Sequence, residues 1–308
     1  MIAWLRSWIG ALFCLLLVPA YGAEVIQVTW PTKHASEPPQ LAPATMRYLP
    51  VFRLGIQTLP EAATVGLVLS QPALLNLNSE QAAKLAPLTG ERYGLMAKSA
   101  AFAKAASALP YCYSEQKPAY GLASVYVPDG AGPETATIVF LHGYGGSFLW
   151  YQHYLSEIFP DRIIICPAYG VTTAFMPVGY LNESIAAASK RLGLPLTKRS
   201  LVGLSAGGYG ACQLYVAAAQ GFSQFICLAC CPPANTVGRY PRDAQPRFLS
   251  GGDEPFVTSG DFQRIAELVR RSCPGVEAAT IPGADHFFLL THREETVAYL
   301  RRWLAVGP

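Results

Sequence analysis

The stretch RSLVGLSAGGYGAC, residues 199–212, decides the fold and raises the first question about function. The apolar run at its start predicts a buried strand, and the small and apolar residues at its end predict a helix. Ser205 stands between the two, with Gly203 and Gly207 at two-residue spacing on either side. The serine belongs either to an ordinary tight turn or to a strained strand-to-helix bend that presents a nucleophile, where small neighbours are needed because backbone segments come close together.

Length and composition limit the possible fold and partner classes before any motif is considered. The chain has 308 residues, of which 51% are hydrophobic and 14% charged, with a formal net charge of +3. This length can bury a large core and favours one domain with an appendage, or two domains. No stripe of lysine and arginine is present, so we expect no nucleic-acid partner.

The region after Gly121 alternates between two patterns. Near-continuous apolar runs predict strands, and amphipathic stretches between them predict helices. This alternation predicts an α/β fold with a mostly parallel, doubly wound sheet covered on both faces. Strands are expected at 122–128, 136–143, 162–167, 199–205, 224–231, 246–253 and 276–283, and helices at 148–159, 179–193, 208–221, 261–273 and 293–304.

The part before this region has a different texture, and we divide the chain into a signal peptide (1–23), a partly helical N-terminal extension (24–118) and a catalytic domain (119–308). Residues 31–45 are rich in proline and are expected to be irregular. Residues 52–59 could form a strand. Residues 78–109 predict one or two helices packed on the main domain. Whether the extension is a lid or a partly disordered leader stays open.

The N-terminus has the pattern of a secretory signal. Arg6 precedes the apolar stretch Ile9–Ala20, and small residues allow cleavage after Gly22 or Ala23. The alternative is an uncleaved anchor, but the stretch is short for a bilayer span of about 20 apolar residues. We therefore expect a secreted or periplasmic protein with no membrane span after cleavage.

Export would permit disulfides among the seven cysteines that follow Cys14. We expect one or two, using Cys112 or Cys273, while the odd number leaves at least one free thiol or an intermolecular pair. The cluster CLACC, residues 227–231, lies in a buried strand context with no histidine nearby. Its thiols are better interpreted as small hydrophobes than as metal ligands, so no metal and no other cofactor is expected.

Reactive residue types collect in the loops that follow the predicted strands, where parallel sheets place their functional groups. LHGYGG, residues 141–146, lacks the Lys-Ser/Thr of a phosphate loop. Its glycines suit an oxyanion hole built from the backbone N–H groups of Tyr144 and Ala206. His142 is expected to organise this loop.

Two further loops offer an acid and a base. Asp253 ends an apolar strand, where a carboxylate can orient an imidazole, and Glu254 and Asp261 are its rivals. His286 follows the last strand in GADHFF and is the best candidate for the general base. The remaining histidines lie in the proline-rich segment or on predicted helices: His34, His153 and His292.

The chain order Ser205, Asp253, His286 matches the order of the α/β-hydrolase triad. With LHGYGG, GLSAGG, GGD and GADHFF, the region from Leu122 to Leu304 resembles the α/β-hydrolase superfamily. Within it, GLSAGGYGA is similar to compact bacterial esterases of the feruloyl-esterase, polyhydroxybutyrate-depolymerase and tributyrin-esterase kind. The resemblance implies a serine hydrolase that works through an acyl-enzyme.

Many members carry a lid between the strand after the nucleophile helix and the strand that bears the acid. Here only residues 232–245 fill this interval, too few for a helical cap, so the site should be open unless the N-terminal extension covers it. Aromatic residues crowd the loops, and Tyr144, Tyr209 and Phe287 are the candidates for binding substrate.

The sequence therefore predicts an exported enzyme that cleaves small-molecule or polymer-linked carboxylic esters. A serine peptidase of the prolyl-oligopeptidase type shares the fold but usually carries a large propeller, for which the N-terminal part is too short. An acyltransferase and a non-catalytic binding protein on the same scaffold are further alternatives. The natural ester and the oligomeric state stay open.

Overall fold

The computed structural model describes residues 22–39, 46–71 and 77–305. The predicted signal segment therefore lies almost entirely outside the described residues. Within those ranges, no helix has the length and apolar character needed to cross a membrane.

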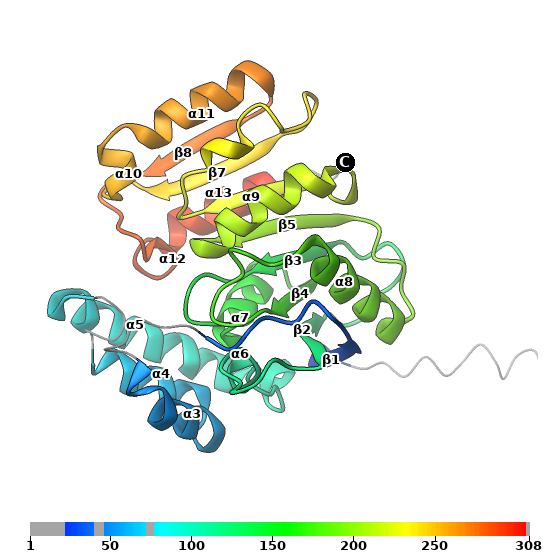
Figure 1. Ribbon diagram of the computed structural model, residues 1–308, viewed down its shortest axis with the longest axis vertical. Coiled ribbons are helices and arrows are strands. Elements are labelled where there is room, and N and C mark those ends of the chain that lie inside the picture. The colour runs from blue at the N-terminus through cyan, green and yellow to red at the C-terminus, as the bar shows by residue number, and fades with distance from the viewer. Residues whose placement is uncertain (1–21, 40–45, 72–76, 306–308) are drawn as a thin grey trace, which may run out of the picture.

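One sheet of eight strands organises the described chain, in the order β1-β2-β4-β3-β5-β6-β7-β8 (Figure 1). β1 and β2 pair antiparallel, β2 pairs antiparallel with β4, and the strands from β4 onward along this order are parallel. This confirms the predicted mostly parallel sheet. The strands are β1 (Glu24–Pro31), β2 (Tyr120–Val127), β3 (Thr137–Leu141), β4 (Ile163–Ala168), β5 (Arg199–Leu204), β6 (Gln224–Leu228), β7 (Pro246–Gly251) and β8 (Glu277–Ile281).

Helices cover both faces of this sheet. Successive residues of a strand point to opposite faces, so each central strand contributes apolar side chains to two helical layers. Leu201 of β5 packs in a core with α8 (Val178–Leu192), α9 (Ala206–Ala218) and α11 (Asp261–Ser272). Its neighbour Val202 packs in a second core with α7 (Leu149–Ile158) and α13 (Arg293–Ala305). The doubly wound arrangement is thus confirmed on both faces.

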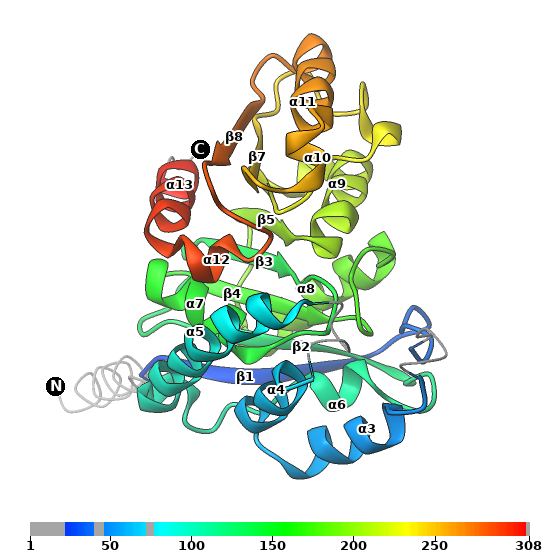
Figure 2. The same cartoon turned by 90° about the vertical axis from the view of Figure 1, so that its left-hand side faces the viewer.

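The N-terminal extension contributes one strand and a group of helices. β1 pairs with β2 along its whole length, so residues 24–31 belong to the main sheet. The helices are α3 (Leu49–Thr58), α4 (Glu61–Leu69), α5 (Ser79–Lys98), the 3₁₀ turn η2 (Ala100–Phe102) and α6 (Leu109–Cys112). Figure 2 shows α5 lying beside α7 and α12, with α4 next to α5 and α3 next to α4 and α6.

One local expectation in this extension is wrong and another is confirmed. Residues 52–58 belong to helix α3 and not to a strand, because Leu49, Phe52 and Ile56 recur at helical spacing on a face that is buried at Leu49 and Ile56. The helix expected after Asn78 is α5, which begins with a capping box between Asn78 and Gln81.

The remaining short elements lie in the loops between the later strands and helices. Between β6 and β7 the chain forms only the 3₁₀ turn η4 (Ala234–Thr236), so the prediction of no large cap insertion is confirmed. Another 3₁₀ turn, η3 (Ala219–Gly221), follows α9, while α10 (Pro255–Thr258) follows β7 and α12 (Phe288–Thr291) follows β8.

Candidate active site

Ser205 lies on a strained bend between β5 and α9. Its backbone has φ 54° and ψ −120°, which a residue with a side chain rarely adopts, and its N–H donates to the carbonyl of Leu228 at 2.8 Å. A Cβ at Gly207 would lie 2.2 Å from the Leu141 carbonyl oxygen, and one at Gly203 would lie 2.4 Å from the Gly207 carbonyl oxygen. The flanking glycines are therefore required by close backbone approach, as the sequence pattern predicts.

His286 faces this serine from the loop between β8 and α12. Its Nε2 lies 2.8 Å from Oγ of Ser205, a hydrogen-bond distance across 81 residues of sequence. The imidazole ring is 39% exposed, so solvent and substrate can reach it. The structure thus brings together the serine and the histidine singled out as nucleophile and base.

The acidic partner is Glu254, which corrects the choice of Asp253. Oε1 of Glu254 lies 2.7 Å from Nδ1 of His286, and the Glu254 side chain is 5% exposed. A turn after β7, in which the Glu254 N–H bonds to the Gly251 carbonyl at 3.3 Å, leaves Asp253 exposed at its corner. The other rival, Asp261, is exposed and pairs with Arg264. Glu254, one residue after Asp253, is therefore the buried carboxylate that contacts the imidazole.

The loop after β3 lies against the nucleophile. A Cβ at Gly143 would come within 3.2 Å of the Ser205 Cβ, so this backbone runs directly beside the serine. The N–H groups of Tyr144 and Ala206 donate to no acceptor among the described residues. Both remain available for a substrate oxygen, which is what the predicted oxyanion hole needs.

His142 is fixed beneath this loop. It is 1% exposed, its Nδ1 donates to the Gly143 carbonyl at 2.8 Å, and its own carbonyl accepts from Thr173 at 2.7 Å. Burial lowers the pKa of His142 to about 4, so the ring is neutral at pH 7. These contacts suit the expected part of His142 in organising the loop.

A cavity of about 330 Å³ opens onto Ser205 and His286. Apart from His286, its lining carries no ionisable acid or base of the Asp, Glu, Lys or Arg type. Tyr144 and Phe287 line it, as expected of substrate contacts, but Tyr209 of α9 does not line it and is 39% exposed. The lining on the hydrolase side is Leu109, Tyr113, Gly143, Tyr144, Gly145, Phe148, Trp150, Tyr151, Leu204, Ser205, His286, Phe287, Leu289 and Leu290.

The other side of the cavity comes from residues that the sequence reasoning did not assign to the site. They lie on α3, α4 and α5 or in the segments that flank these helices: Tyr48, Leu49, Phe52, Thr64, Val65, Val68, Leu69, Leu77, Leu85 and Thr89. The extension therefore covers the site, which otherwise lacks a cap. Helical spacing of apolar residues was the available signal, but it does not say against what a helix packs.

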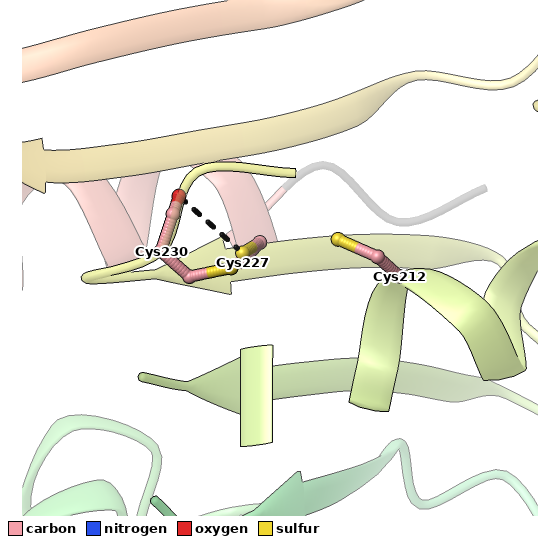
Figure 3. A group of neighbouring side chains, drawn as sticks. All are labelled: Cys212, Cys227 and Cys230. Atoms are coloured by element: carbon pink, nitrogen blue, oxygen red, sulfur yellow. Dashed lines mark hydrogen bonds between the residues drawn. The ribbon is translucent and has the colours of Figure 1, made fainter. Parts of the chain in front are cut away.

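All seven cysteines of the described chain are free thiols, so the one or two disulfides expected at Cys112 or Cys273 are not formed. Cys212, Cys227 and Cys230 form a buried cluster, with sulfur atoms within 4.8 Å of one another (Figure 3). A Cβ at Gly208 would lie 2.8 Å from the Cys230 Cβ, so the cluster packs directly under the first turn of α9.

These three thiols are the group in the described chain that could hold a soft metal. Metal binding requires thiolates. Burial raises the pKa of the Cys227 and Cys230 thiols well above the ordinary value, whereas at Cys212 hydrogen bonds from those two thiols outweigh burial and lower the pKa. The Cys227 and Cys230 thiols donate to the backbone carbonyls of Cys230 and Cys231, and all three side chains are fully buried, which fits the interpretation of close-packed small hydrophobes.

Four features of this site occur together in one known architecture. They are the strand order, the strained serine between β5 and α9, the acid after β7 and the histidine after β8. The fold is that of an α/β-hydrolase. Of the three predicted catalytic residues only the acid differs, and Glu254 keeps the predicted place of the acid in the chain order.

Neither a protein-family model nor a curated protein matches the chain. Solved structures similar to it include a thermostable esterase, at 19% identity and TM-score 0.46 over 61% of this chain and 60% of that one. An esterase from Pyrococcus furiosus matches at 13% identity and TM-score 0.49, over 60% of this chain and 87% of that one. A poly(3-hydroxybutyrate) depolymerase from Bordetella parapertussis matches at 13% identity and TM-score 0.47, over 61% of this chain and 85% of that one. The match thus spans less than two thirds of the thermostable esterase. The case for catalysis comes from the site's own atoms.

Proposed function

We propose that this protein is a serine hydrolase that cleaves carboxylic esters through an acyl-enzyme. The observation that carries the proposal is the continuous hydrogen-bond chain from Ser205 through His286 to the buried carboxylate of Glu254. A serine hydroxyl is a weak nucleophile until an adjacent base takes its proton, and this arrangement supplies the base and the group that orients it.

Each step has a residue in position. Nε2 of His286 accepts the Ser205 proton as Oγ attacks the ester carbonyl, and Glu254 stabilises the imidazolium at Nδ1. The carbonyl oxygen, now an anion, accepts hydrogen bonds from the N–H groups of Tyr144 and Ala206. His286 returns its proton to the leaving alcohol as the C–O bond breaks. Water then attacks the acyl-enzyme by the same route and releases the acid.

The cavity favours an ester over a peptide substrate. Its walls offer no charged side chain to hold peptide termini or charged side chains, and the apolar residues suit an acyl or aryl group. An acyltransferase would use the same serine with an alcohol in place of water, and only product analysis separates the two. We further propose that the protein is exported, on the signal-like segment Ile9–Ala20.

A panel of p-nitrophenyl esters and peptide p-nitroanilides tests the activity. We expect turnover of the esters, little or none of the anilides, and loss of turnover in Ser205→Ala with an unchanged circular dichroism spectrum. No ester turnover by the wild type would rule out the proposal. Ester turnover unchanged in Ser205→Ala would rule out the site.

A further inference from the structure

The loop between β3 and α7, residues 142–148, carries the Tyr144 N–H and is called the oxyanion loop below. Directly after Tyr144 come Gly145 and Gly146, both with φ 108°. Side chains disfavour this conformation, and glycine adopts it without restraining the backbone on either side. The position of the Tyr144 N–H therefore depends on contacts that other parts of the chain make with the loop.

Two of these contacts come from the hydrolase part of the chain. Nδ1 of His142 donates to the Gly143 carbonyl at 2.8 Å, and this carbonyl shares a peptide group with the Tyr144 N–H. In a trans peptide the two groups point in opposite directions, so this bond directs the N–H. The next peptide group is held by the Gly145 N–H, which donates to the Val171 carbonyl at 2.8 Å.

The third contact comes from the N-terminal extension. Tyr113, which follows α6, donates its hydroxyl to the Gly145 carbonyl at 3.0 Å. This bond holds the peptide group between the two glycines, where the backbone has the most freedom. Tyr113 is 8% exposed, and burial raises the pKa of its hydroxyl, so the hydroxyl is a proton donor at neutral pH.

Tyr113 is itself held in place by α3. Arg53 donates to the carbonyls of Tyr113 and Ser114 at 2.7 and 3.0 Å, which fixes the backbone on which the ring is carried. The Phe52 ring meets the Tyr113 ring edge to face, with 4.8 Å between the ring centroids. The direction of the hydroxyl is therefore set within the extension and does not depend on the loop that it holds.

The extension contacts the oxyanion loop at two further points. A Cβ at Gly146 would lie 2.9 Å from Cδ2 of Leu109, so the loop backbone lies directly on α6. At the end of the loop, the Leu149 N–H donates to Oε1 of Glu61 at 2.8 Å. Leu149 begins α7, and a carboxylate at this end of a helix is stabilising, whereas the Phe148 side chain cannot accept such a bond. The extension thus holds the loop from its glycine pair to the start of α7.

We propose that Tyr113 is a positioning residue of this hydrolase, whose hydroxyl holds the oxyanion loop so that the Tyr144 N–H meets the negative oxygen of the tetrahedral intermediate. The inference rests on the proposed function. Tyr113 acts through the loop and its effect is greatest when the oxygen carries charge, so loss of the hydroxyl lowers kcat and leaves KM unchanged. A misplacement of about 1 Å in such a site can cost up to about 10²-fold in rate.

Tyr113→Phe tests the proposal, because it removes the hydroxyl and keeps the ring. The matched control is Tyr111→Phe. Tyr111 lies on α6, is 6% exposed and donates its hydroxyl to a backbone carbonyl of β2, that of Tyr120, at 2.8 Å. With p-nitrophenyl butyrate we expect Tyr113→Phe to lose about tenfold or more in kcat with KM unchanged, and Tyr111→Phe to keep both constants. Thermal unfolding of the two variants controls for folding.

Binding of trifluoromethyl heptyl ketone gives a second readout. Oγ of Ser205 adds to the ketone carbon, His286 takes the hydroxyl proton, and the carbonyl oxygen becomes an anion in the oxyanion hole. The affinity should fall in Tyr113→Phe by the same factor as kcat and stay at the wild-type value in Tyr111→Phe.

The outcomes separate this inference from the proposed function. No ester turnover by the wild-type protein would overturn the proposed function. With wild-type turnover present, the role of Tyr113 is overturned if Tyr113→Phe and Tyr111→Phe have the same kcat and the same affinity for the ketone. It is also overturned if Tyr113→Phe raises KM alone, since the hydroxyl would then contribute to substrate binding and not to the oxyanion hole.

Discussion

Nδ1 of His286 lies 2.7 Å from Oε1 of Glu254, a carboxylate whose side chain is 5% exposed. This contact fixes a proton on Nδ1 and leaves Nε2 as the acceptor toward Ser205, which is 2.8 Å away. The acid lies one residue beyond the position that the strand end suggests. The assignment of the triad therefore turns on which of two adjacent carboxyl groups the ring meets.

The first prediction concerns that choice. Glu254→Gln keeps the shape of the side chain but can leave the imidazole in the wrong tautomer, and we expect kcat to fall by roughly 10³–10⁴. Asp253→Asn alters an exposed side chain and should change kcat by no more than a few-fold. Both are measured with p-nitrophenyl butyrate, and thermal unfolding of each variant controls for folding. A larger loss in Asp253→Asn would restore Asp253 as the acid.

The second prediction concerns Gly207, two residues after the nucleophile. The Cβ of Gly207→Ala would meet the backbone oxygens of Leu141 and His142 at 2.2 and 2.4 Å; Leu141 is held in β3, and the His142 carbonyl is held by the Thr173 hydroxyl. We expect a loss of about 3 kcal/mol or more in the free energy of unfolding. Gly94→Ala is the control, since its Cβ would enter open space on α5, and it should be neutral or stabilising by up to about 1 kcal/mol. Equal effects of the two substitutions would contradict the packing described for the bend.

Part of this site is readable from sequence because it is local. The bend at Ser205 requires glycine at fixed spacing whatever the rest of the fold does, and the loops after successive parallel strands meet at one edge of the sheet. That is why Ser205 and His286 could be predicted. The choice between Asp253 and Glu254 depends on the turn after Gly251, which exposes the first and buries the second.

The position of α3 and α4 over the cavity and the absence of disulfides could not be predicted for a different reason. The spacing of Leu49, Phe52 and Ile56 indicates that one face of a helix is buried, but not that the face covers a cavity formed 150 residues later around Ser205. Disulfides depend on distances between distant segments. The sequence order of Cys112 and Cys273 gave no information on these distances.

The third prediction is a dependence of stability on pH. Burial lowers the pKa of His142 from its ordinary value near 6.5 to about 4, so the unfolded chain binds a proton that the folded chain does not. Stability from this residue is therefore complete above pH 6.5 and falls as the pH drops toward 4, with a loss of about 2 kcal/mol between pH 7 and pH 5. Urea unfolding measures it.

The matched variant is His142→Asn, whose amide can still donate to the Gly143 carbonyl but does not titrate. Its loss of stability between the same two pH values should be smaller than the wild-type loss by about 2 kcal/mol. Identical pH dependence in the two proteins would show that His142 is protonated in the folded state.

The fourth prediction concerns the size of the cavity. Val68→Trp adds bulk on the inner face of α4, where Val68 lines the cavity, and should lower kcat/KM for dissolved p-nitrophenyl octanoate at least tenfold while sparing p-nitrophenyl acetate. Leu67→Trp adds similar bulk to the neighbouring exposed position and should affect neither ester in solution. If Val68→Trp lowers kcat/KM equally for both esters, the acyl chain does not bind against the inner face of α4.

The most direct test of the central claim is the site of covalent labelling by a fluorophosphonate, read by mass spectrometry of the intact protein and of its peptides. The account predicts one adduct per chain, located on Ser205, with no adduct in Ser205→Ala and much slower labelling in Glu254→Gln than in Asp253→Asn. An adduct on another residue, or wild-type protein that does not react, would contradict it.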